Sequence, residues 1–211
     1  CMKLISETAT TLVLNRNELH TKSGELLAAG FKIIRSNITN VSLSFNNLYK
    51  MPAKELATAL PALQGKIITL NLSKNNFGHG SGLDLGLILE SIVQDELNLS
   101  ENDLYALGDD LAEPLARMSK TIIAFDISGN FLFKMPGVQL AKALETMSLS
   151  VRILNLSSND FDRMYGPDFA IALGAISKGV NYVNLSQNNL HQMPIQALGE
   201  GLKALTMNIT D

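Results

Sequence analysis

The sequence predicts an α/β fold, a right-handed solenoid of about seven repeats. Parallel strands are expected on the concave face of a curved arc and helices on its convex face. Two observations support this prediction. The pattern Leu-x-Leu-x-x-Asn-x-Leu, with other apolar residues allowed at the leucine sites, recurs seven times at intervals of 27 to 29 residues. A second apolar set, at helical spacing, begins about ten residues after the asparagine.

One asparagine anchors each repeat, and the seven are Asn17, Asn46, Asn75, Asn102, Asn130, Asn159 and Asn188. Each lies where the chain turns out of a predicted strand, so its amide is expected to satisfy backbone groups of neighbouring loops. The seven side chains should therefore form a structural ladder through the interior. We expect replacement of Asn102 by Ala to cost roughly 1–3 kcal/mol, because buried backbone groups would lose their partners.

Apolar residues at a period of two predict short strands with one buried face. These pairs are Leu12 and Leu14, Val41 and Leu43, Leu70 and Leu72, Leu97 and Leu99, Phe125 and Ile127, Leu154 and Leu156, and Val183 and Leu185. The predicted helices bury Leu56, Leu60 and Leu63; Leu85, Leu89 and Ile92; Leu111, Leu115 and Met118; Leu140, Leu144 and Met147; Phe169, Leu173 and Ile176; and Leu198, Leu202 and Leu205. Pro61 and Pro114 fall inside helical patterns and should shorten or kink the second and fourth helices.

The repeats predict a single domain over residues 1–211. Ile209 falls 29 residues after Val180, where another strand would begin, so we expect an incomplete eighth repeat from about residue 206. Solenoid ends normally carry a polar cap, and none follows here. Because Cys1 precedes Met2, we expect a fragment of a longer protein, with a short native protein as the alternative.

Composition and charge argue against several classes of partner. The formal net charge is -3 and no two basic residues are adjacent, so binding to nucleic acid or to an anionic membrane is not expected. No apolar stretch approaches the roughly 20 residues that span a bilayer, so no membrane insertion is predicted. Cys1 is the only cysteine, which favours a reducing compartment.

No motif indicates catalysis, a metal or a cofactor. His20, His79 and His191 lie in different repeats and cannot converge on one ion, so we predict no metal site. The stretch from Gly78 to Gly82 lies where a phosphate-binding loop would be found, but it lacks the lysine and the spacing of that motif. We therefore predict that the chain is not an enzyme.

Two rows of side chains are expected to point away from the core on the concave face. The first row is Val13, Ser42, Asn71, Asn98, Asp126, Asn155 and Asn184, and the second is Asn15, Ser44, Ser73, Ser100, Ser128, Ser157 and Ser186. Such small polar side chains could bind a partner, although they are also the ordinary consensus of the repeat. Asp126 interrupts the asparagine row, so we take it, with Asn98 and Asn155, as the candidate concave site.

A further row lies three residues after each anchoring asparagine and contains His20, Tyr49, Gly78, Tyr105, Phe133, Asp162 and His191. Five of these seven residues carry a ring, and aromatic residues are enriched in binding hot spots. We therefore predict a protein-binding rim formed by His20, Tyr49, Tyr105, Phe133 and His191. The alternative is that the rings cover the helix starts, with Met51, Met135, Met164 and Met193 packed beneath them.

These repeats resemble the ribonuclease-inhibitor-like class of leucine-rich repeats over nearly the whole chain. The segments Leu70–Asn75 and Lys22–Leu26 also resemble the leucine-rich-repeat effectors that Legionella-type intracellular bacteria inject into host cells. This resemblance implies a protein-interaction module, secreted by a bacterium into the host cytoplasm, that binds a host protein. Two alternatives remain open: a GTPase-activating regulator of the Ran type that uses Arg16 or Arg163, and the targeting arm of a larger enzyme.

Overall fold

The computed structural model describes residues 8–34, 36–63, 67–147 and 149–206. Within these ranges one parallel sheet contains seven strands, each paired with the next in chain order. The strands are β1 Thr11–Val13, β2 Asn40–Ser42, β3 Thr69–Asn71, β4 Glu96–Asn98, β5 Ala124–Asp126, β6 Ile153–Asn155 and β7 Tyr182–Asn184. The helices are α1 Gly24–Lys32, α2 Ala53–Ala59, α3 Gly82–Glu90, α4 Ala112–Arg117, α5 Gly137–Thr146, α6 Gly166–Gly174 and α7 Ile195–Thr206.

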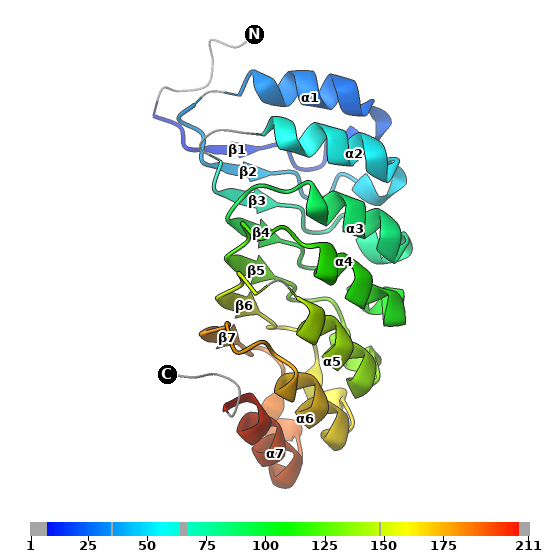
Figure 1. The fold of residues 1–211 in the computed structure, drawn as a ribbon, viewed down its shortest axis with the longest axis vertical. Helices are drawn as coiled ribbons and strands as arrows, with labels where there is room; N and C mark the ends of the chain where they lie inside the picture. The colour runs from blue at the N-terminus through cyan, green and yellow to red at the C-terminus, as the bar shows by residue number, and fades with distance from the viewer. Residues whose placement is uncertain (1–7, 35, 64–66, 148, 207–211) are drawn as a thin grey trace.

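The repeats stack into an arc, with the strands on its concave side and the helices on its convex side (Figure 1). The curvature has a simple cause. Neighbouring strands lie about 4.8 Å apart, whereas packed helices need about 8–10 Å. The helical side of the stack must therefore spread further than the sheet. The predicted α/β solenoid of strand–helix repeats is confirmed.

A short 3₁₀ turn connects each strand to its helix. These turns are η2 Leu19–Thr21, η3 Leu48–Lys50, η5 Phe77–His79, η6 Leu104–Leu111, η7 Leu132–Lys134, η8 Phe161–Arg163 and η9 Leu190–Gln192. The turn η6 is longer than the others and contains a kink at Gly108, whose φ is 52°. We call the segment from the residue before each anchoring asparagine to the end of the 3₁₀ turn the rising-loop rim.

Both prolines inside the helical patterns shorten their helices, as predicted. The α-helical part of α2 ends at Ala59, and Pro61 lies in the 3₁₀ turn η4 (Leu60–Ala62) that follows. The helix α4 has six residues and begins at Ala112, so Pro114 lies in its first turn, where the missing N–H removes no helical hydrogen bond.

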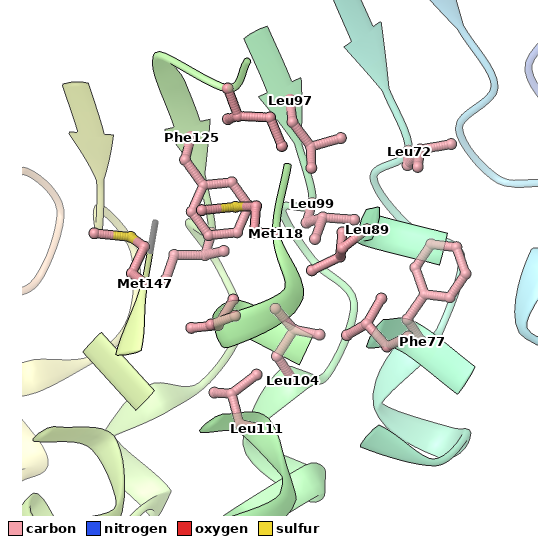
Figure 2. Packing of buried hydrophobic residues seen from close by; sticks show 14 of the residues in the cluster. Leu72, Phe77, Leu89, Leu97, Leu99, Leu104, Leu111, Met118, Phe125 and Met147 are labelled. Carbon is pink, nitrogen blue, oxygen red and sulfur yellow. The ribbon is translucent and has the colours of Figure 1, made fainter. Parts of the chain in front are cut away.

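A single apolar core runs between the sheet and the helices through all the repeats. Figure 2 shows part of it in the central repeats. In the centre of the arc, Phe125 on the sheet side packs near Met118 and Met147 from the helical side, and all three are buried. The helical positions predicted to be buried are buried from α2 to α6.

The last coil differs from this prediction. Leu198 is only partly buried and Leu202 is 41% exposed, because no further coil within the described residues covers α7. The first coil shows the same end effect, since Leu12 and Leu14 are only partly buried. The predicted eighth repeat lies outside the described residues, except for Thr206, which is the last residue of α7. Cys1 and Ile209 also lie outside them.

Candidate functional site

Buried asparagines link successive repeats through hydrogen bonds between their side chains and backbone groups. The side-chain oxygen of Asn102 accepts the N–H groups of Asn75, at 2.8 Å, and Phe77, at 3.4 Å, from the preceding coil. Its amide nitrogen donates to the carbonyl oxygens of Leu72, Leu99 and Ser100. Equivalent bonds occur from Asn46 onward. Asn17 differs: it is exposed, and its amide donates to the carbonyl of Asn15.

The residues immediately before and after each anchoring asparagine have left-handed backbones. They are Arg16, Glu18, Phe45, Asn47, Lys74, Asn76, Glu101, Asp103, Gly129, Phe131, Ser158, Asp160, Gln187 and Asn189. Gly, Asn and Asp tolerate this conformation, whereas a bulky side chain in it is an outlier. Arg16, Lys74 and Gln187 also place long side chains on such a backbone, and Phe45, with φ of 57°, and Phe131, with φ of 54°, are the two aromatic residues among the fourteen; each is 40% exposed. Strained residues of this kind cluster at functional sites.

Phe45 is the centre of a first group of stacked side chains. The Arg16 guanidinium lies 4.5 Å from the centre of its ring, and the Lys74 ammonium lies 4.9 Å from it. Lys74 also forms an ion pair with Glu101 at 2.9 Å. These four residues come from the first four repeats, so the group extends along the rising-loop rim of the N-terminal half of the arc.

A second group lies further along the same rim. The Lys134 ammonium is 4.0 Å from the centre of the Tyr105 ring and 4.9 Å from that of Phe131, and these two rings contact each other edge to face at 6.0 Å. In the next coil the Arg163 guanidinium lies 4.2 Å from the Phe133 ring centre. Tyr105 and Phe133 were predicted for this rim. Phe131 and Lys134 were not.

The predicted rim residues also pack against the core. Tyr49, Tyr105 and Phe133 are partly buried against it, and the four methionines predicted beneath the rim are buried. His20 is half-buried, and its Nδ1 lies 2.9 Å from the carbonyl oxygen of Asn46. His191 is exposed on the last coil. The rings therefore take part in packing while leaving part of their surface accessible.

On the concave face, Asn98, Asp126 and Asn155 occupy adjacent strands at one level. The Oδ1 atom of each accepts the backbone N–H of the residue two positions later, at 2.8 Å, 2.8 Å and 3.1 Å respectively. Asp126 thus makes the same local hydrogen bond as its asparagine neighbours. It differs from them by its negative charge.

A third outward row of the sheet was not considered in the sequence prediction. It contains Thr11, Asn40, Thr69, Glu96, Ala124, Ile153 and Tyr182. The small side chain of Ala124 leaves a hollow of about 250 Å³, which Glu96, Asp126 and Ile153 help to line. The period of two that placed the asparagine row would also have found this row. Ile153 and Tyr182 add exposed apolar surface to the concave face.

Within the described ranges, no group of three or more His, Cys, Asp and Glu residues could hold a metal ion. The imidazole of His79 instead lies 3.3 Å from an Asp103 carboxylate oxygen. No helix in these ranges is long and apolar enough to cross a bilayer. Arg16 and Arg163 lie in different stacked groups, each against a phenylalanine ring.

Solved structures with the same fold include the leucine-rich repeat-containing protein LegL7 from Legionella pneumophila. It matches with a TM-score of 0.89 and 24% identity over 98% of this chain and 65% of that chain. A chain from the complex of Rad7 and Elc1 in yeast matches with a TM-score of 0.50 and 12% identity, over 89% of this chain and 45% of that one. Neither a protein-family model nor a curated protein sequence matches. The fold is that of the leucine-rich-repeat proteins, and the chain spans 65% of the length of the LegL7 chain.

Proposed function

We propose that the chain is a protein–protein interaction module that binds its partner through the rising-loop rim and the adjoining concave face. The observation that carries this proposal is the pair of exposed phenylalanines, Phe45 and Phe131, held in left-handed conformations beside cationic side chains. A bulky residue costs about 1–2 kcal/mol in this conformation. A role in binding explains why two such residues lie on the surface despite this cost.

The chemistry of the rim suits a protein partner. Aromatic residues and arginine are enriched in binding hot spots, and the two stacked groups combine both. Each ring is held by a cation or by a second ring, so little side-chain freedom remains to be lost on binding. Arg163 keeps 60% of its side-chain surface exposed while it lies on Phe133, and one of its guanidinium nitrogens is 3.7 Å from an Asp160 carboxylate oxygen. The guanidinium has five N–H donors, so it can meet an acidic group of the partner beside Asp160.

We further propose that the partner is a host protein, and that the chain acts in the host cytoplasm as a secreted bacterial effector. The likeness to a Legionella pneumophila leucine-rich-repeat protein over 98% of this chain supports this proposal. The single cysteine is consistent with a reducing compartment.

Two other roles have specific support. The exposed guanidinium of Arg163 favours a GTPase-activating regulator, in which a loop arginine stabilises transition-state charge. A nucleotide-hydrolysis assay with host small GTPases tests this role, since stimulation should be lost in Arg16→Ala and Arg163→Ala variants. The coverage of 65% of the LegL7 chain favours the targeting arm of a larger protein. Sequencing the natural reading frame beyond Asp211 would decide that question.

Affinity capture from host-cell extract tests the main proposal. The wild-type chain should retain a partner that the Phe45→Asn/Phe131→Asn variant loses, because asparagine accepts the left-handed backbone but provides no ring. The control is Ile171→Ala, a change at an exposed apolar residue of α6. Retention of the same proteins by wild type and the double variant would exclude the rim as the binding surface.

A further inference from the structure

We propose that a cavity beside the loop Gly78–Gly82 receives one bulky apolar side chain from an acidic segment of a partner protein. The inference rests on the proposed protein-binding function and adds the chemistry of the partner. The cavity has a volume of about 450 Å³ and lies between the second and third coils, where η3 and α2 face η5 and α3. Its volume is within the range of about 300–1,000 Å³ that is typical of ligand pockets.

The cavity coincides with a departure of the third repeat from its own pattern. Five residues after the anchoring asparagine, four repeats carry a buried methionine, namely Met51, Met135, Met164 and Met193. The third repeat has Gly80 at this position, and Gly80 lines the cavity. The side chain that fills the space beneath the rim in those four coils is therefore missing in this coil.

Close packing requires two of the three glycines in this loop but not Gly80. A Cβ atom on Gly78 would collide with the backbone of Asp103, and one on Gly82 would collide with the backbone of Asp110. For a Cβ atom on Gly80 the nearest atom outside the adjoining residues would be the Phe77 carbonyl oxygen, at 3.4 Å, which is an ordinary van der Waals contact. Its backbone, with φ of -91° and ψ of -159°, is extended and open to other residues. Gly80 therefore keeps space free.

The cavity is lined mainly by apolar residues, and the charged residues of its lining are two lysines and one aspartate, a net positive charge. Core residues form the inner surface: Leu48, Met51, Phe77, Leu85 and Ile88. The charged residues of the lining are Lys50, Lys54 and Asp84, and Tyr49 lies beside them. Within the described residues neither lysine belongs to an ion pair, although the Lys50 ammonium lies 5.8 Å from the centre of the Tyr49 ring.

The start of α3 does not offer a competing anion site. The Ser81 side chain accepts the N–H of Asp84 at 3.1 Å and donates to its carboxylate at 2.8 Å. The first turn of the helix is thus capped, and the carboxylate of Asp84, which also lines the cavity, is held there by the Ser81 hydroxyl. What remains is an apolar space beside two lysines, whose charge exceeds that of Asp84. This arrangement suits a Phe, Leu or Met side chain whose neighbours in the partner are Asp or Glu.

The test is selection of a phage-displayed random-peptide library on the wild-type chain, followed by binding measurements with a Gly80→Met variant. This variant introduces the residue that four other repeats carry, and its melting temperature should equal or exceed that of wild type. We expect the selected peptides to share one bulky apolar residue flanked by Asp or Glu. They should bind Gly80→Met at least about tenfold more weakly, as expected when a buried anchor loses its pocket.

A Lys50→Ser/Lys54→Ser variant provides an independent test if Gly80→Met does not fold. It keeps the cavity and should weaken the same peptides while reducing the salt dependence of their binding. Failure to enrich apolar–acidic peptides would overturn the inference. Equal binding to wild type and a folded Gly80→Met would overturn it as well, as would equal binding to the lysine variant.

The two proposals can fail separately. If the partner captured from host extract is lost with Phe45→Asn/Phe131→Asn but kept by Gly80→Met, the rim proposal stands and the cavity inference is wrong. If every variant retains the partner, both are wrong. The captured partner should also carry an acidic segment of the selected type, and competition by the selected peptide should release it from the wild-type chain.

Discussion

Replacing Asn102 by alanine should lower the free energy of unfolding by about 2–6 kcal/mol, twice the range expected from the sequence, because two buried N–H groups lose their acceptor and each costs about 1–3 kcal/mol. These groups belong to Asn75 and Phe77, which both donate to the Asn102 side-chain oxygen. The three carbonyl oxygens that receive the Asn102 amide each keep another donor: the side-chain amides of Asn75 and Asn130 and the backbone N–H of Lys74. The two N–H groups therefore dominate the cost.

The matched control is Asn17→Ala, because Asn17 has the same place in its repeat but is exposed. This change should cost under about 0.5 kcal/mol, as for most surface substitutions. Urea unfolding and thermal melting, both followed by far-ultraviolet circular dichroism, measure the difference. A domain of this size loses about 2–4 °C per kcal/mol, so Asn102→Ala should melt roughly 4–24 °C below wild type. Equal melting temperatures for the two variants would refute the ladder as a source of stability.

Three other substitutions have defined outcomes in the same unfolding assays. Gly78→Ala should be strongly destabilising, because its Cβ would collide with the backbone of the next coil, whereas Gly80→Ala should fold normally. Asp126→Asn should change stability by under about 0.5 kcal/mol, since asparagine accepts the same backbone N–H, and any loss of partner binding would then report its charge. Leu144→Ala should cost about 2–5 kcal/mol and the half-exposed Leu202→Ala markedly less.

The architecture was predictable because its cause is periodic. A strand pattern and a helix pattern that recur every 27 to 29 residues admit few arrangements other than a stacked solenoid. The prediction was wrong for Leu202, whose burial depends on a coil beyond its own and not on the local pattern. Periodicity specifies what each repeat presents to a neighbour. It does not specify which repeat lacks a neighbour among the described residues.

The candidate site was only partly predictable, for a related reason. Tyr105 and Phe133 were found because they share a row with other rings. Phe131 was missed although it stands in a row where five of the six other repeats carry Asn or Asp, and Phe45 was missed because its row, with Arg, Lys, Glu, Gly, Ser and Gln in the other repeats, follows no pattern. For Phe131 that contrast was the available signal, but only the backbone angles show that both phenylalanines are in the left-handed conformation. The contact between Lys74 and the ring of Phe45, 29 residues away in the chain, required the packing of the coils.

The rim can be tested without confusing binding with folding. Asparagine at positions 45 and 131 should relieve about 1–2 kcal/mol of strain at each site. It should also remove three cation–π contacts worth about 0.5–1 kcal/mol each and the edge-to-face contact with Tyr105, worth about 0.5–1.5 kcal/mol. These terms nearly cancel. The free energy of unfolding of Phe45→Asn/Phe131→Asn should therefore stay within about 1 kcal/mol of the wild-type value.

The dissociation constant of the captured partner, measured for wild type and for this double variant, tests the central claim most directly. Loss of hot-spot rings should weaken binding at least about tenfold while leaving the melting curve nearly unchanged. The convex-face variant Ile171→Ala should bind as wild type does. Equal dissociation constants for wild type and the double variant would contradict the claim that this solenoid binds its partner through the rising-loop rim.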